Sequence, residues 1–155
     1  MRAKERGWRT VTAGAVMTLG WVVGPDPVRA IQEARPVQQD GLEAAVGWAR
    51  DAWMAHDMAG LVSRSDTVRL HLPGISSASV RPAQAARLLQ DYLKTAEELG
   101  FTLRDVRRLA SDHAYAEMAR HYLVRGTSEE REETVFLGYR VVEGVWRLRE
   151  VRVTP

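Results

Sequence analysis

Apolar residues recur at three- and four-residue steps over residues 41–56, and this spacing predicts an amphipathic helix. The positions on its apolar stripe are Leu42, Ala45, Val46, Ala49, Ala52, Trp53 and His56. Asp40 precedes the stripe and is available as its N-cap. A second, short helical segment, Met58–Ser63, is expected directly after Asp57. The ordered part of the chain should therefore begin with two helices.

A half-buried strand is predicted next, over Thr67–Leu72. In this segment Val68, Leu70 and Leu72 alternate with Arg69 and His71. Pro73–Gly74 is expected to end the strand, because both residues favour turns. Ser76–Ser79 contains only small residues and is expected to continue as a polar loop.

A second long helix is predicted after this loop. Ser79 is expected to be its N-cap, and Pro82 lies in its first turn, where the missing N–H loses no hydrogen bond. Gly100 is expected to end the helix. The apolar stripe consists of Ala85, Leu88, Leu89, Tyr92, Leu93 and Ala96.

From residue 101 onward the hydrophobic period changes from three or four residues to two, which predicts strands. The four expected strands are Phe101–Leu109, Ala114–Arg125, Thr134–Val142 and Val145–Val153. The charged segment 126–133 is expected to be a loop, and Glu143–Gly144 a two-residue hairpin turn. Helices followed by an antiparallel meander predict an α+β domain with the helices on one face of a curved sheet.

The last strand contains an irregularity in its alternation. Trp146 and Leu148 share one face, whereas Val151 and Val153 are offset from that face by one position. A β-bulge near Arg149–Glu150 would return all four side chains to the core.

The first thirty residues have the pattern of a secretory signal peptide. Four basic residues precede the uncharged 13-residue stretch Val11–Val23, which Gly24–Pro27 interrupts. This stretch is shorter than the roughly 20 residues that a membrane-spanning helix needs. Val28 and Ala30 are small residues at the positions that signal peptidase recognises, so cleavage is expected after Ala30.

The sequence thus predicts three segments: a signal peptide at 1–30, a flexible linker at 31–40 and a single α+β domain at 41–155. The linker is expected because residues 31–40 lack periodicity and contain few large apolar side chains. The expected location is outside the cytoplasm, in the periplasm or secreted.

Removing the first thirty residues changes the charge of the chain. The full sequence has 22 basic and 20 acidic residues and an isoelectric point near 9.3. Residues 1–30 hold five of the basic and two of the acidic residues, which leaves 17 basic and 18 acidic residues in the remainder. We therefore expect no nucleic-acid partner and, after cleavage, no contact with the membrane.

The sequence contains no cysteine, so the domain has neither a disulfide framework nor a lipidated anchor. An apolar core must stabilise it, and a chain of this size can bury one.

The order of helices and strands, together with several core and turn positions, carries a resemblance to known proteins. Those positions are Val68–Gly74, Ser79–Ala85, Leu88–Leu89, Tyr92–Leu93, Gly144–Leu148, Val151 and Val153. Over residues 41–154 the chain resembles an exported bacterial family, the domain of unknown function DUF4783. That family lies in the cone-shaped superfamily of nuclear transport factor two, ketosteroid isomerase and scytalone dehydratase.

Two positions depart from the family pattern. Tyr92–Leu93 stands where paired phenylalanines are expected, and Ala119 stands where a strand glycine is usual. Both differences concern packing, and the family has no established catalytic residue that they could remove.

The resemblance implies a cystatin-like, cone-shaped fold with a cavity between the helices and the concave sheet. Enzymes of the superfamily use a buried carboxylate as base, with a tyrosine or an acid opposite it. The candidate cavity-lining residues in this sequence are Trp53, His56, Leu89, Tyr92, Tyr122 and Trp146. Of these, His56 is the residue that could bring an ionisable group into the cavity from the first helix.

Other polar residues have simpler explanations than catalysis. Asp57 and Asp66 occur where helix ends and turns favour short acids. The serines of 76–79 lack a nucleophile-elbow motif. Most acids are expected in water, including Glu97 and Glu98 at a helix end and Glu129–Glu133 in a loop. Tyr115 and Tyr139 are further candidates with no assigned role.

No metal site or cofactor is predicted. His71, His113 and His121 lack the spacing that would bring two of them to one metal, although His113 and His121 could approach each other across the sheet.

Three functions are compatible with these observations. The first, which the absence of a catalytic set favours, is a non-catalytic exported domain that binds a small apolar ligand or a partner protein at the cavity or the sheet face. The second is a cavity enzyme of the isomerase or dehydratase type, which would need a buried acid with a raised pKa. The third is a structural module that forms a homodimer through the sheet.

Overall fold

The computed structural model describes the backbone of residues 27–155 and the side chains of residues 41–76 and 79–155. Its elements in chain order are α1 (Pro27–Met54), α2 (Met58–Val62), β1 (Val68–Leu72), β2 (Ile75–Val80), α3 (Pro82–Leu93), β3 (Ala96–Ala110), β4 (His113–Val124), β5 (Glu130–Val142) and β6 (Val145–Thr154). The six strands form one sheet in the order β2-β1-β6-β5-β4-β3. Only the β1–β6 pair is parallel within it.

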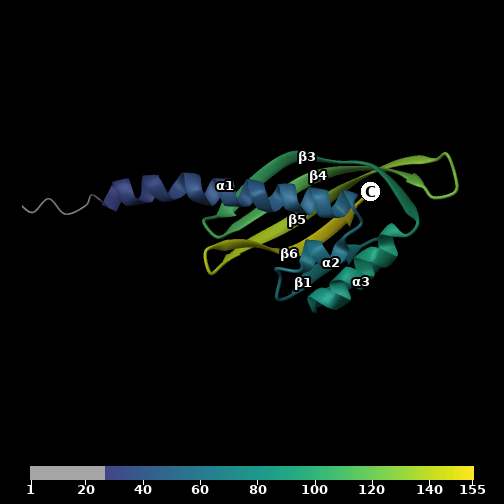
Figure 1. The fold of residues 1–155 in the computed structure, drawn as a ribbon, viewed down its shortest axis with the longest axis horizontal. Helices are drawn as coiled ribbons and strands as arrows, with labels where there is room; N and C mark the ends of the chain where they lie inside the picture. The colour runs from purple at the N-terminus through teal and green to yellow at the C-terminus, as the bar shows by residue number, and fades with distance from the viewer. Residues whose placement is uncertain (1–26) are drawn as a thin grey trace, which may run out of the picture.

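The three helices lie on one face of this curved sheet, as the α+β prediction requires (Figure 1). α1 runs along the strands and contacts β3 and β6, whereas α3 packs against α2 and β1. The core lies between the two layers. Its sheet side consists of alternate residues of β1 and β4 to β6, such as Leu70, Leu137 and Val151, each 0% exposed, together with Phe101 of β3.

The apolar stripes of the helices are buried as predicted. Trp53 and Leu89 are 0% exposed, and Trp146 of β6 is 5% exposed. Asp57 is the N-cap of α2, and its carboxylate accepts a hydrogen bond of 2.8 Å from the backbone N–H of Gly60. The interpretation of Asp57 as a helix cap is therefore confirmed.

The first helix begins earlier than the sequence indicates. α1 starts at Pro27, so residues 31–40, expected to be a flexible linker, are helical, and Asp40 lies inside the helix rather than at its cap. Gln, Glu, Ala and Arg predominate in this segment and favour helix even without an apolar stripe. Figure 1 shows this part of α1 extending beyond the end of the sheet.

Residues 1–26, most of the predicted signal peptide, lie outside the described residues, so export and the domain boundaries at 30 and 40 stay predictions. Within residues 27–155, no helix combines the length and the apolar character needed to cross a bilayer.

The predicted polar loop at Ser76–Ser79 is wrong. Ile75–Val80 forms the edge strand β2, which pairs antiparallel with β1 after a tight turn at Pro73–Gly74. Gly74 has φ 77°, a conformation that glycine adopts without strain. Because the turn brings the chain back alongside β1, even a segment of small polar residues forms a strand there by pairing with β1.

The predicted limits of the second long helix are also wrong. Its N-cap is Arg81 rather than Ser79, and its C-cap is Lys94. Residues 96–100 belong to β3, so Gly100 lies in a strand and does not end the helix. Ala96 continues the helical spacing, but it is equally placed to pair with Val124 of β4 at the start of a long strand.

The hairpin between β5 and β6 is confirmed in detail. Glu143 and Gly144 have φ values of 52° and 77°, which a two-residue hairpin turn requires. Gly138 pairs with Glu150 and Tyr139 with Leu148, so Arg149 is the extra residue of a β-bulge. The bulge returns Val151 and Val153 to the core, as predicted.

Candidate functional site

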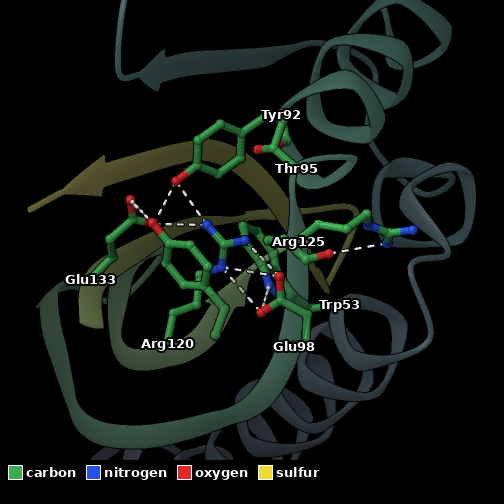
Figure 2. Close-up of polar contacts among 9 residues, drawn as sticks. Trp53, Tyr92, Thr95, Glu98, Arg120, Arg125 and Glu133 are labelled. Atoms are coloured by element: carbon green, nitrogen blue, oxygen red, sulfur yellow. Dashed lines mark hydrogen bonds and ion pairs between the residues drawn. The ribbon is translucent and has the colours of Figure 1, made fainter. Parts of the chain in front are cut away.

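A buried arginine organises the interior at one end of the sheet (Figure 2). Arg120 lies on the inward face of β4, two residues beyond Met118, and its side chain is 1% exposed. Its Nη2 donates to Glu98 Oε1 at 2.6 Å, and its Nη1 donates to Glu133 Oε2 at 2.7 Å. The two carboxylates come from β3 and β5, so Arg120 joins three neighbouring strands through their side chains.

Two tyrosines complete this cluster. Arg120 Nη1 also donates to Tyr92 Oη at 2.8 Å, and Tyr92 in turn donates to Glu133. Tyr122 Oη donates to the other Glu133 oxygen at 3.0 Å. The Arg120 guanidinium carbon lies 4.0 Å from the centre of the Tyr122 ring, which adds a cation–π contact. We call these five residues, Tyr92, Glu98, Arg120, Tyr122 and Glu133, the Arg120 cluster.

The electrostatics of the Arg120 cluster keep Arg120 positively charged and its two tyrosines neutral. Burial by itself lowers the pKa of Arg120, but the hydrogen bonds and the charge of Glu98 outweigh this and raise it. Burial, followed by the hydrogen bond to Glu133, raises the pKa values of both Tyr92 and Tyr122. The tyrosines therefore stay protonated and act as hydrogen-bond donors.

The Arg120 cluster is saturated with hydrogen bonds. Among the described side chains, no buried nitrogen or oxygen atom lacks a hydrogen-bond partner. Trp53 closes the cluster on the helix side, where its ring stacks on Phe101 with a centroid distance of 4.6 Å. Its Nε1 donates to Glu98 at 3.4 Å. Both carboxylates of the cluster are therefore engaged in hydrogen bonds within it, and neither is free to act as a base on a substrate.

Sequence reasoning missed the two acids of the Arg120 cluster. Glu98 and Glu133 were expected in water, but their side chains are 2% and 12% exposed. The expectation followed from placing Glu98 at a helix end and Glu133 in a loop, whereas both lie in strands. One signal was available, because Arg120 falls on the same alternate positions of its strand as the buried Ala114, Ala116 and Met118. An arginine on that face requires acidic partners.

A groove with an apolar floor lies between α1 and β3, with a volume of about 560 Å³. Leu42, Val46 and Gly47 of α1 form one wall. Leu103 and Val106 of β3, with Met118 of β4, form the other wall and the floor. Leu42, Val46 and Met118 are buried, whereas Leu103 is 48% exposed. Glu43, Arg50 and Arg108 also line the groove, and these three side chains are exposed.

The groove and the Arg120 cluster are neighbours along the same elements. Trp53 lies one helical turn beyond Arg50 in α1, and Phe101 lies two residues before Leu103 in β3. Arg120 follows Met118 by two residues in β4. Phe101 lies between Glu98 and Leu103 in β3, and no residue of the Arg120 cluster lines the groove.

The structure brings together only some of the predicted cavity residues. Trp53, Tyr92 and Tyr122 gather around Arg120, and Leu89 is buried on α3. Trp146 packs elsewhere, with its ring 5.6 Å from the Arg108 guanidinium. None of the six predicted residues lines the groove between α1 and β3.

His56 is half-buried at the end of α1 rather than within a cavity. It has φ 55°, the left-handed conformation in which helices often end. Its backbone N–H donates to Trp53 O at 3.0 Å. Its position is that of a helix-terminating residue.

The remaining histidines lie apart. His113 and His121 are at opposite ends of β4, where they pair with Arg140 and Glu132 of β5 respectively. His71 lies on β1, 3.8 Å from Glu150. In the part of the chain that the structure describes, no three His, Asp or Glu side chains are grouped so that they could hold a metal ion. Asp66 is exposed and pairs with Arg147 and Arg149.

The sheet order, the helices on one face and the groove beneath α1 define an α+β protein of the nuclear-transport-factor-two-like, or cystatin-like, fold. A solved DUF4783 family protein from Bacteroides ovatus superposes with a TM-score of 0.58 at 14% identity, covering 68% of this chain and 90% of that one. A ketosteroid isomerase-like protein from Erwinia carotovora atroseptica gives a TM-score of 0.60 at 16% identity, with coverage of 75% and 96%. These similarities confirm the expected resemblance at the level of the fold.

A third solved structure extends the comparison. A domain of unknown function with a cystatin-like fold from Nostoc punctiforme has a TM-score of 0.58 and 15% identity, with coverage of 76% of each chain. No protein-family model matches this chain, and no curated protein matches its sequence.

Proposed function

We propose that this protein is an exported, non-catalytic domain that binds a small apolar ligand in the groove between α1 and β3. The observation that carries the proposal is the groove itself, about 560 Å³ in volume with an apolar floor. Grooves of this size, between about 300 and 1,000 Å³, are typical of small-molecule sites. Export rests on the signal-peptide pattern of residues 1–30.

The rim of the groove indicates what kind of apolar ligand would fit. Arg50 and Arg108 line it together with a single acid, Glu43. Arg108 is held over the Trp146 ring by a cation–π contact, so its position is constrained without an acidic partner. An apolar molecule with one anionic end would place its body on Val46 and Met118 and its charge near these guanidinium groups.

The buried acids support binding rather than catalysis. An isomerase-type mechanism needs a carboxylate that can accept a proton from a substrate. Glu98 and Glu133 already accept hydrogen bonds from Arg120 at 2.6 and 2.7 Å, and neither of them lines the groove. Among the described residues that line the groove, Glu43 is the only one with a carboxylate, and this side chain is exposed.

Gly47 allows a direct test of the groove. A Cβ atom built on Gly47 meets no described atom within 4 Å, so a larger side chain can enter the groove without displacing the core. Gly47→Leu should therefore fill the site and leave the fold intact. Ala44→Leu is the matched control, because Ala44 lies on the exposed side of the same helix and does not line the groove.

The probe is anilinonaphthalene sulfonate, a fluorescent apolar anion. The full chain should bind it saturably, with about one site per chain. Gly47→Leu should weaken binding at least about tenfold, which corresponds to 1.4 kcal/mol, while Ala44→Leu changes it less than about twofold. Equal binding by both variants, with native circular dichroism, would show that the probe occupies another site.

A further inference from the structure

Figure 1 shows the helices on one face of the sheet. On the opposite, outward face, a row of residues crosses all six strands. The strand register places them side by side in the order Ser79, Arg69, Glu150, Gly138, Tyr115 and Arg107. No helix contributes to this row. Its side chains are polar or aromatic, whereas the adjacent inward row, Leu70, Val151, Leu137 and Ala116, is aliphatic.

A hollow of about 330 Å³ lies beside the centre of this row. Its floor is Gly138, flanked by Tyr115 and Glu150. A Cβ atom on Gly138 would lie 2.9 Å from the Tyr115 ring and 3.0 Å from Glu150 Cβ, so only glycine leaves these two side chains where they are. The His113 ring lies 5.1 Å from that of Tyr115 and also borders the hollow.

Three arginines from three strands border the hollow: Arg69 of β1, Arg140 of β5 and Arg149 of β6. The β6 bulge at Arg149 places this residue and Glu150 at the same hollow. Thr67 and Ser79, two residues with hydroxyl groups, also line the hollow. The lining therefore combines guanidinium donors with hydroxyl donors, as oxyanion sites do.

These arginines are weakly neutralised. No carboxylate of a described residue lies within 4.0 Å of Arg69. Arg140 reaches Asp112 at 3.5 Å and Arg149 reaches Asp66 at 3.4 Å, and both aspartates are more than half exposed. Such exposed ion pairs contribute little, so a bound anion can replace them.

Among the described residues, Glu150 is the one acid of the lining, and it already has hydrogen-bond partners. Glu150 is 8% exposed, accepts a hydrogen bond from Arg152 at 2.7 Å and accepts another from Tyr115 at 3.1 Å. Its charge is thereby compensated from outside the hollow, since Arg152 does not line it. The net charge of the lining is therefore positive and comes from the three arginines.

We propose that this hollow is a second binding site, specific for a tetrahedral oxyanion of the phosphate or sulfate class. Three guanidinium groups approaching from three strands suit a group with several oxygen atoms and about two negative charges. A single carboxylate would engage fewer of them. The site lies on the opposite face of the sheet from the groove, so it does not depend on the function proposed for the groove.

The test is a titration of the full chain with inorganic phosphate, sulfate and acetate at constant ionic strength, followed by amide NMR. Constant ionic strength is required because added salt screens exposed charges. Phosphate or sulfate should produce saturable shifts at Ser79, Tyr115 and Gly138, with a Kd near or below about 1 mM. The anion with the lower Kd indicates whether the natural ligand carries a phosphate or a sulfate group. Acetate should bind more weakly than both.

Arg69→Gln is the primary variant, because Arg69 is exposed and its loss disturbs no ion pair among the described residues. It should raise the Kd for the better anion at least about fivefold, which exceeds the twofold effect of a typical surface charge. Arg140→Gln, on the opposite side of the hollow, provides a second test. Arg131→Gln is the matched control, since Arg131 is an exposed arginine of β5 outside the hollow.

The proposal is overturned if the shifts do not saturate below about 20 mM. It is also overturned if Arg69→Gln and Arg131→Gln alter the affinity equally, because binding would then reflect general charge. Binding of anilinonaphthalene sulfonate at the groove should persist in Arg69→Gln, so failure at one site can be distinguished from failure at the other.

Discussion

Arg120 is buried, at 1% exposure, although arginine is seldom fully buried in proteins. Its guanidinium is buried with two carboxylates, and each of the three groups has hydrogen-bond partners. A buried ion pair of this kind adds little net stability compared with an apolar core of the same volume. Removing one partner is different, because the other charges then remain buried and unpaired.

Replacing Arg120 with methionine should therefore destabilise the protein strongly. Glu98 and Glu133 would lose their cation while staying 2% and 12% exposed. We expect the free energy of unfolding, measured in urea, to fall by about 3–5 kcal/mol. Glu132→Gln is the control: Glu132 is half-exposed on the same strand as Glu133, and its loss should change stability by less than about 0.5 kcal/mol. A loss below about 1 kcal/mol for Arg120→Met would contradict this account of the cluster.

The tyrosines predict how stability depends on alkaline pH. Burial raises the pKa values of all four tyrosines, Tyr92, Tyr115, Tyr122 and Tyr139. In the unfolded chain they ionise near pH 10, so above this pH the unfolded state binds fewer protons than the folded state. The free energy of unfolding is thus unaffected by these groups below pH 10 and falls as the pH rises above it.

Absorbance at 295 nm, recorded with far-ultraviolet circular dichroism, measures this effect. Tyrosinate formation should coincide with alkaline unfolding, and Tyr92→Phe should make the fall in stability with pH shallower. Ionisation of most tyrosines near pH 10 in a chain that keeps its native dichroism would contradict the burial described above.

At the scale of single residues, sequence patterns identified burial better than they identified partners. Trp53, Leu89 and Trp146 are buried as predicted, because helical and strand periodicity indicates a face. Periodicity does not indicate which acidic side chain will pair with which basic side chain. Glu98 and Arg120 are 22 residues apart in sequence, and their contact depends on the β3–β4 register.

Among the elements, α1 has two roles: it covers the sheet and forms a wall of the groove. Gly47 lies in its interior, where glycine is unfavourable for helix formation. A Cβ atom at Gly47 would meet open space, so no packing contact requires glycine at this position.

Gly47→Ala should stabilise the protein by about 0.5–1 kcal/mol, because alanine favours helix and its Cβ meets no atom. Gly60→Ala in α2 should have the opposite sign. A Cβ there would overlap the Asp57 carboxylate, which caps that helix, and loss of a cap costs about 1 kcal/mol. Thermal and urea unfolding measure both changes. Destabilisation by Gly47→Ala would show that the groove wall is already in close contact with another group.

Element boundaries show where local sequence is insufficient. The Glu143–Gly144 turn and the bulge at Arg149 were predictable because each has a strict conformational or alternation requirement. β2 was not predictable, since its segment has no alternation of large residues and forms a strand by pairing with β1. Ala96 was assigned to the helix because helical spacing continues through it, and only pairing with Val124 shows that it begins β3.

For the whole molecule, the fold was predictable and the position of the proposed binding groove was not. The order of periodicities indicated helices on a curved antiparallel sheet, and the similarity to solved nuclear-transport-factor-two-like proteins confirms that fold. The expected site was an interior cavity lined by residues such as Tyr92 and Tyr122. The Arg120 cluster occupies that position, and none of its residues lines the groove.

Export can be tested on the intact protein in its native host. Cleavage after Ala30 would remove five of the 22 basic residues and leave a slightly acidic chain. Mass spectrometry of the exported protein should find an N-terminus at or near Ile31. Recovery of the intact 17.4 kDa chain from the cytoplasm alone would contradict export.

The most direct test of the proposed function maps where an apolar anion binds. Decanoate would be titrated into the full chain, and amide and methyl NMR shifts would be followed for each residue. The account predicts saturable shifts concentrated at Val46, Gly47, Val106 and Met118, which line the groove. Shifts centred instead on Tyr92, Glu98 and Tyr122 would show that the interior opens to ligands, and the absence of saturable shifts would show that the groove is not a site for apolar anions.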